Sequence, residues 1–197
     1  ISVGAGVMVS QYFGAKEREA LSRTIGNCIT LTAAASLFIM VVGTLCARPL
    51  LELLNTPESI IDWCASYLII MMLGSSGIAY YNILCGILRG LGDSVSALIY
   101  LLIATVINIV LDVTFVAVFH MGVPGVALAT VIAQIASAVM CMIKLKRMSD
   151  LFDLKPQYLK PNGHHAWNII RLGLPSGITQ AIFSMAMVVV QSLTNSF

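Results

Sequence analysis

Asp112 is the only charged residue in the 50-residue stretch Ser94–Ile143, and it is the first candidate for chemistry. Asn108 and Thr105 precede it by four and seven residues, which places all three on one face of a helix. Carboxylate, amide and hydroxyl oxygens suit a hard cation such as Na⁺, whereas a desolvated carboxylate can instead carry a proton. The alternative is a hydrogen-bond network between packed helices. We interpret Asp112 and Asn108 as a candidate cation-coupling site, and expect no metal site besides Na⁺ at Asp112.

Polar side chains recur at helical spacing in two further stretches. Thr130, Gln134 and Ser137 follow Asp112 and would face it across a pair of adjacent helices, which predicts a hydrophilic pocket between them. Gln180 and Ser184 share one face of the last apolar stretch. A polar stripe on a membrane helix faces protein or a water-filled cavity, so these residues either line a substrate path or pack against a neighbour.

A third feature is the turn Gly86–Ser94, which contains Arg89, Gly90, Gly92 and Asp93. The glycines permit a tight backbone and Asp93 can cap the following helix. Because the spacing and lysine of a phosphate-binding loop are missing from this segment, we interpret it as a structural turn.

The elements that must position these residues are membrane helices. Hydrophobic residues make up 58% of the 197-residue chain and charged residues only 10%, which excludes a soluble globular protein, a nucleic-acid binder and a disordered chain. Stretches with no charge or a single charge predict helices over residues 24–47, 63–88, 95–119, 125–143 and 166–197. Residues 1–15 start without a Met or a signal peptide and are expected to be the end of a helix, as in an internal fragment.

The distribution of basic residues predicts the orientation. If every predicted helix crosses once, ten of the 11 Lys and Arg residues fall on one side, and Arg48 alone falls on the other. By the positive-inside rule the basic side is the cytoplasm. We therefore expect a multi-pass protein of the plasma (inner) membrane with cytoplasmic basic loops.

No pattern in the chain indicates an enzyme or a cofactor. The sequence contains no catalytic Ser/His/Asp pattern, no paired catalytic carboxylates and no nucleotide-binding motif. The five cysteines show no CxxC spacing, and we interpret them as small apolar residues.

Five segments in a fixed order resemble the multidrug and toxic compound extrusion (MATE) family of secondary transporters. Residues 4–15 (GAGVMVSQYFGA) resemble the end of the family's second helix, and residues 86–94 (GILRGLGDS) its turn between helices four and five. Residues 104–112 (ATVINIVLD) and 121–130 (MGVPGVALAT) resemble helix five and the start of helix six. Residues 171–180 (RLGLPSGITQ) resemble the start of helix seven.

The resemblance implies an all-α polytopic membrane protein built from a partial six-helix lobe and the first helix of a second lobe. Residues 1–144 would belong to the amino-terminal lobe (end of helix two, then helices three to six), 145–165 to a cytoplasmic linker and 166–197 to helix seven. It also implies antiport of Na⁺ or H⁺ against cationic or amphipathic drugs. The family's amino-lobe cation site matches Asn108, Asp112 and Thr130.

Two other functions stay open at this point. A lipid-linked oligosaccharide flippase of the same superfamily would carry more basic charge inside its cavity, whereas every Lys and Arg here lies near the end of a predicted helix. A non-transporting membrane scaffold would not need the intramembrane Asp112. For the transporter we expect small-molecule substrates, the lipid bilayer, no nucleic acid and a monomer.

Overall fold

The long uncharged stretches fold as helices, as the sequence predicts. The structure, a computed structural model, describes residues 2–53, 58–148, 150–153, 156–160 and 163–194, and contains no strand within them. In chain order the α-helices are α1 (Ser2–Gly14), α2 (Arg18–Leu53), α3 (Glu58–Leu73), α4 (Ser75–Gly90), α5 (Ser94–Val113), α6 (Gly122–Arg147) and α7 (Gly163–Thr194). A π-helix over Thr114–Val118 continues α5, and a 3₁₀-helix, η2, covers Pro156–Leu159.

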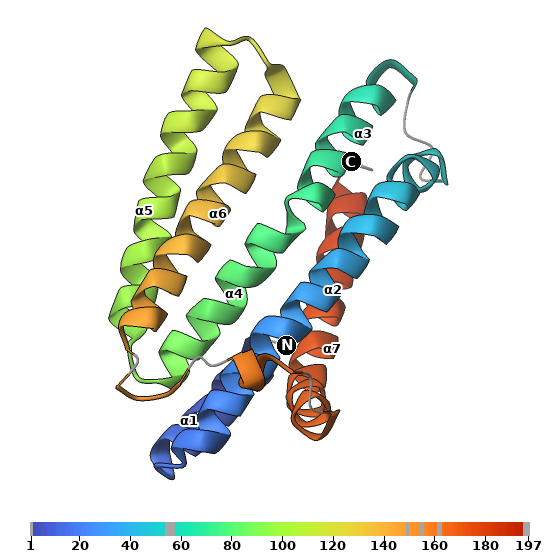
Figure 1. The fold of residues 1–197 in the computed structure, drawn as a ribbon. Coiled ribbons are helices and arrows are strands. Elements are labelled where there is room, and N and C mark those ends of the chain that lie inside the picture. The colour runs from blue at the N-terminus through green and yellow to red at the C-terminus, as the bar shows by residue number, and fades with distance from the viewer. Residues whose placement is uncertain (1, 54–57, 149, 154–155, 161–162, 195–197) are drawn as a thin grey trace.

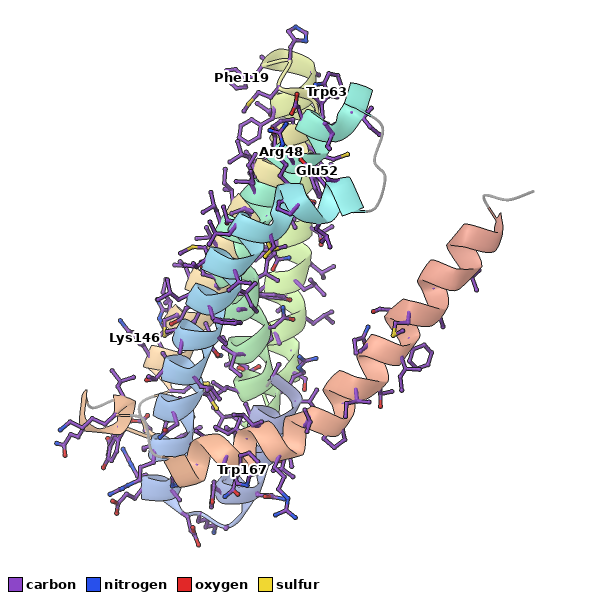
Figure 2. The ribbon with its side chains drawn as sticks, turned by 90° about the vertical axis from the view of Figure 1, so that its right-hand side faces the viewer. Arg48, Glu52, Trp63, Phe119, Lys146 and Trp167 are labelled. Carbon is purple, nitrogen blue, oxygen red and sulfur yellow. The ribbon has the colours of Figure 1, made fainter. Side chains whose placement is uncertain are left out.

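Three helical segments are long and apolar enough to cross a membrane: α2, α5 with its π-helix, and α6. The pair α3–α4 provides a fourth if it counts as one span. In Figure 1, α5 and α6 form an antiparallel hairpin on one side of α4, while α2 and α7 lie on its other side. Arg48 and Glu52 of α2 lie at the opposite end of the bundle from Trp167 (Figure 2), and we call the end that holds the α1–α2 and α4–α5 turns the basic end.

The prediction of one continuous helix over residues 63–88 is wrong. The structure divides this stretch into α3 and α4, which meet at Gly74 with a bend of 45°. A Cβ atom at Gly74 would lie 2.2 Å from a methyl carbon of Val131 on α6, so the glycine lets the bend contact α6 closely. At this bend the chain packs closely against α6, and a residue larger than glycine would hold the helices apart.

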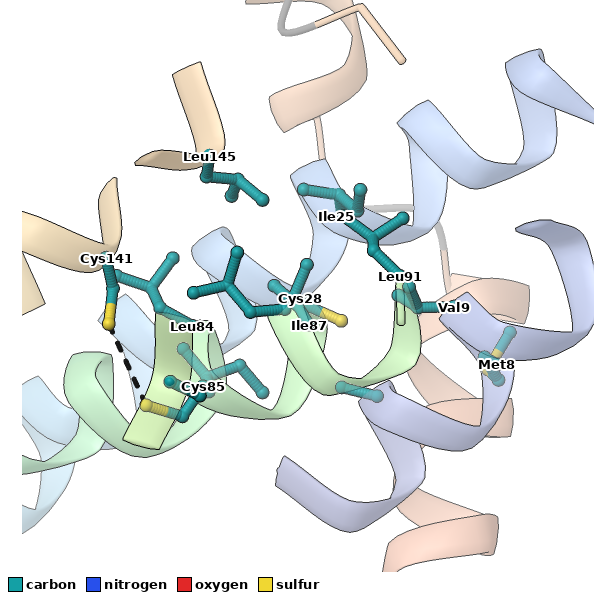
Figure 3. Close-up of a cluster of buried hydrophobic side chains, with 14 of the residues drawn as sticks. Met8, Val9, Ile25, Cys28, Leu84, Cys85, Ile87, Leu91, Cys141 and Leu145 are labelled. Atoms are coloured by element: carbon teal, nitrogen blue, oxygen red, sulfur yellow. Dashed lines mark hydrogen bonds between the residues drawn. The ribbon is translucent and has the colours of Figure 1, made fainter. Parts of the chain in front are cut away.

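The buried core lies in the half of the bundle near the basic end. Its apolar side chains come mainly from α1, α2, α4 and α6, and they include Val9, Ile25, Ile87 and Leu145, which Figure 3 shows together. On α5, by contrast, large apolar residues such as Val106 and Ile109 are more than half exposed. Because lipid tails are as apolar as these side chains, an exposed apolar face is what a lipid-contacting helix requires.

Glycines bring α1 close to α4 and α7. A Cβ at Gly90 of α4 would lie 2.7 Å from the carbonyl oxygen of Gly6, and one at Gly4 would lie 2.3 Å from that of Ile169 on α7. Close backbone approach at small residues is a common way to pack helices in membranes. Beyond this contact the described side chains of α7 are mostly exposed, and Figure 2 shows the helix leaning away from the bundle.

The segment between α6 and α7 packs onto the basic end of α2. Arg18 forms an ion pair with Asp153 at 3.1 Å and donates a hydrogen bond to the carbonyl oxygen of Asp150 at 2.9 Å. Phe152 is fully buried, and Thr30 donates a hydrogen bond to the carbonyl oxygen of Leu159 at 2.7 Å. We call residues 150–153 and 156–160 the docked linker; α6 ends before it at Arg147 and α7 starts after it at Gly163.

Candidate functional site

The α5–α6 hairpin joins two of the predicted cation ligands directly. The side-chain Nδ2 of Asn108 donates a hydrogen bond of 3.4 Å to Oγ1 of Thr130, and Thr130 in turn donates to the carbonyl oxygen of Val126 at 3.0 Å. The hydrogen bond to Thr130 uses the nitrogen of the Asn108 amide. The amide oxygen of Asn108 is therefore the atom of this side chain that could face a cation.

Asp112 lies one helical turn beyond Asn108. Its Oδ1 atom is buried and has no hydrogen-bond partner among the described residues. A carboxylate oxygen withdrawn from water without a donor costs free energy, which a proton or a bound cation removes. Asp112 and Asn108 lie about one helical turn apart on α5, and Thr130 on α6 bonds to Asn108, so the three side chains supply carboxylate, amide and hydroxyl oxygens from two adjacent helices. This donor set fits Na⁺, and the isolated carboxylate also fits a proton.

The other polar residues of the hairpin are placed differently. Ser137 is buried and donates to the carbonyl oxygen of Tyr100 at 3.1 Å, so it holds α5 to α6. Oε1 of Gln134 is buried without a partner in the described part of the chain, but Gln134 lies one turn from Thr130 on the side away from Asp112. Thr105 is exposed and donates to the carbonyl oxygen of Leu101 at 2.9 Å. These three residues therefore do not gather around Asp112.

The predicted polar stripe on α7 is not brought to this site. Gln180 and Ser184 are exposed, and the Ser184 hydroxyl donates to the carbonyl oxygen of Gln180 at 3.0 Å. Among the described helices, α7 contacts α1 and α2 rather than the α5–α6 hairpin. A role for these residues in a substrate path stays a prediction.

The turn between α4 and α5 is a tightly bonded corner. Gly92 has a φ of +87°, a conformation that glycine adopts without strain, and the N–H of Asp93 bonds to the carbonyl oxygen of Leu88 at 2.9 Å. Asp93 caps α5: its carboxylate accepts from the backbone N–H and the hydroxyl of Ser96 at 3.0 and 2.8 Å. It also forms an ion pair with Nζ of Lys144 at 3.0 Å.

These contacts determine the charge state of Asp93. Partial burial raises its pKa, but the bonds from Ser96 and the Lys144 ammonium outweigh burial and hold the pKa below the ordinary 3.8. Sequence reasoning treated Lys144 only as a loop charge and missed this pairing. The available signal was that Asp93 lies at the start of one predicted helix and Lys144 at the end of the next, which places both residues on the same side of the membrane.

Arg89, the remaining residue of the turn, lines two open cavities. One, of about 320 Å³, lies between α1 and α4 and includes Ser2, Ser10 and Gly90. The other, of about 480 Å³, lies between α4 and α5 and includes Tyr81 and Cys85. The Arg89 Nε atom donates to the carbonyl oxygen of Cys85 at 3.2 Å.

The chain is similar to known proteins in both sequence and fold. The MatE family matches residues 1–114. The chain is 30% identical over 204 residues to the probable multidrug resistance protein YoeA of Bacillus subtilis, covering all of this chain and 44% of YoeA. It is 26% identical to the multidrug export protein MepA of Staphylococcus aureus, covering 88% of this chain and 39% of MepA. The chain therefore spans less than half the length of these curated relatives.

The fold agrees with a solved structure of the same kind. An inward-facing conformation of a multidrug resistance MATE family transporter of the MOP superfamily superposes with a TM-score of 0.88 at 24% identity, over 94% of this chain and 42% of that one. The likeness confirms the predicted all-helical, multi-pass membrane fold. With more than half of its residues matched, the chain belongs to the MatE family of multidrug and toxic compound extrusion proteins, a family of transporters and not of enzymes.

Proposed function

We propose that the protein exports cationic or amphipathic drugs in exchange for Na⁺ or H⁺, and that Asp112, Asn108 and Thr130 bind the coupling ion. The observation that carries the proposal is the buried Oδ1 of Asp112, which has no donor in the described region and belongs to a residue one helical turn from Asn108, the partner of Thr130. A carboxylate at this position in a membrane helix needs a compensating positive charge or a proton. The names of YoeA and MepA support drugs as the substrate class.

Ion binding at this site could drive transport through a difference in affinity between two conformations. The hairpin is held to itself by the Ser137–Tyr100 and Asn108–Thr130 bonds, whereas α5 makes few contacts with α4. An ion that binds more tightly in one arrangement of the hairpin shifts the equilibrium towards that arrangement. A substrate that prefers the other arrangement is then released when the ion binds.

In the same proposal the basic end faces the cytoplasm and the membrane is the plasma (inner) membrane, because the sequence predicts ten basic residues on that side and Arg48 alone on the other. Residues 1–144 form part of the amino-terminal lobe, 145–165 the linker between lobes, and 166–197 the first helix of the second lobe. Residues 195–197 lie outside the described part of the chain. The transporter works as a monomer with the coupling ion and without an organic cofactor.

The test is efflux of a fluorescent cation such as ethidium from cells that express the full-length protein containing this chain, with an imposed Na⁺ or proton gradient. Asp112→Asn keeps the size of the side chain but removes its negative charge, so we expect gradient-driven efflux to be lost at normal membrane expression. Asp62→Asn is the matched control, since the Asp62 carboxylate is exposed to solvent and pairs with Arg48 only at 3.8 Å. The gradient that drives the wild type identifies the ion.

A second pair of variants separates a ligand from a packing residue. Thr130→Ala should weaken the dependence of efflux on ion concentration, because Thr130 contacts Asn108. Ser66→Ala removes a hydroxyl that likewise bonds to a carbonyl four residues earlier, at 2.8 Å, but on the exposed face of α3. Unchanged efflux in Asp112→Asn would reject the coupling site. Absence of efflux in the wild type would reject drug export and favour the flippase or the scaffold.

A further inference from the structure

Two buried thiols meet where α4 packs against α6. The Sγ atoms of Cys85 and Cys141 lie 3.7 Å apart (Figure 3), although the two residues are 56 positions apart in the sequence. Cys85 is 4% exposed and Cys141 is fully buried. The two sulfur atoms are in contact, and a disulfide would require them to approach to about 2.05 Å. A small adjustment of side chains on two packed helices could supply that movement.

The surroundings of the two thiols differ. Cys85 lines the open cavity of about 480 Å³ between α4 and α5, which also contains Asn82 and Arg89. Cys141 is not among the residues that line this cavity. Arg89 brings positive charge to the cavity one turn from Cys85, and positive charge near a thiol is typical of reactive cysteines. Small reagents can therefore reach Cys85 first, while Cys141 lies behind it.

We propose that Cys85 and Cys141 form an oxidisable dithiol, which a peroxide converts into a disulfide that joins α4 to α6. In the first step the Cys85 sulfur attacks one oxygen of hydrogen peroxide, the O–O bond breaks, and a sulfenic acid and one water form. In the second step the Cys141 sulfur attacks the Cys85 sulfur, the S–O bond breaks, and a second water leaves. The two thiols lose two electrons and two protons, and the peroxide is reduced to two waters.

The disulfide would link α4 covalently to α6 at the contact between these two helices. α4 packs against α1, α2 and α6, and α6 is the hairpin partner of α5. A covalent link at this position fixes the α5–α6 hairpin to the rest of the bundle near the basic end. The proposal does not depend on the transported substrate or on the coupling ion.

The experiment uses the full chain in detergent micelles, treated with increasing hydrogen peroxide until the exposed Cys46 becomes oxidised. Remaining thiols are blocked with a maleimide, disulfides are then reduced and labelled with a heavier maleimide, and the peptides are identified by mass spectrometry. We expect reversible loss of two of the five free thiols, with the heavy label on Cys85 and Cys141. In a denaturing detergent the preference for this pair should disappear.

Two variants make the result specific. Cys141→Ser should abolish the disulfide and leave Cys85 as a sulfenic acid, which a 1,3-dicarbonyl probe traps. Cys28→Ser is the matched control, because Cys28 is fully buried on α2, and it should leave the pair unchanged. The proposal is overturned if Cys85 and Cys141 stay reduced when Cys46 is oxidised, or if Cys85 forms its disulfide with another cysteine.

Discussion

Replacing Gly26 with alanine should release the docked linker from α2. The added Cβ would lie 2.1 Å from the carbonyl oxygen of Tyr158 and 3.2 Å from the nitrogen of Leu159, both backbone atoms that no side-chain rotation can move. Reaching the 3.4 Å at which ordinary contact begins requires η2 to move by about 1.3 Å. That shift stretches the 2.7 Å bond from Thr30 to the Leu159 carbonyl oxygen and moves Tyr158 from beneath the Arg23 guanidinium, 5.9 Å from its ring.

Overpacking of this kind costs about 1–3 kcal/mol. If the cost falls on docking, the undocked fraction of the linker rises about five- to 150-fold, and cleavage of the undocked state rises by the same factor. The assay is limited chymotrypsin cleavage after Tyr158, followed by mass spectrometry, on the protein in detergent.

The control is Gly14→Ala at the end of α1, where a Cβ would meet nothing within 4 Å. That change should leave cleavage at Tyr158 unaltered and stabilise α1 by up to about 1 kcal/mol. Cleavage of Gly26→Ala at the wild-type rate, with an unchanged melting temperature, would refute the argument that Gly26 is required for docking.

Two further predictions concern the helix connections. The Asp93 carboxylate, whose pKa is lowered, should stabilise the fold fully above pH 3.8 and lose this contribution as the pH falls through its lower folded pKa. Lys144→Met should shrink that acid-dependent drop in melting temperature, and a drop equal to that of the wild type would contradict the role of the ion pair. Gly74→Ala should destabilise the fold by about 1–3 kcal/mol through collision with Val131. Adding Val131→Ala removes the two methyl carbons but leaves the Cβ of residue 131 at 2.9 Å, so it should recover part of the loss in thermal unfolding. A double variant as unstable as the single one would contradict this cause.

The sequence predicts the α5–α6 hairpin well, because a 50-residue stretch with Asp112 as its single charge is interrupted by a turn rich in glycine and proline. It could not predict the bend at Gly74, since an isolated glycine in an apolar stretch is also tolerated in a straight helix. The bend depends on contact with Val131, 57 residues later, which no local pattern reports. α2 also begins before and ends after the uncharged stretch 24–47, because charged residues continue a helix once it leaves the apolar layer.

In the candidate site, too, the sequence predicts some features and not others. The spacing of Thr105, Asn108 and Asp112 predicts one face of a helix, because such a prediction depends only on the helical period. The hydrogen bond from Asn108 to Thr130 depends on the register between helices, which the π-helix over Thr114–Val118 shifts in a way that composition does not show. Thr105 is exposed because the preceding residue, Ala104, occupies the buried position on α5.

The docked linker has a consequence for the order of assembly during synthesis. Its contacts with α2 join residues 132 and 135 positions apart, as between Arg18 and the segment at Asp150 and Asp153. These contacts form late in translation, because the chain emerges from its amino terminus and α3 to α6 are made in between. Until then the docked linker, with the buried ring of Phe152, is not yet packed on the basic end of α2. A ribosome stalled before residue 150 would therefore present α2 with this surface open to chaperones and proteases.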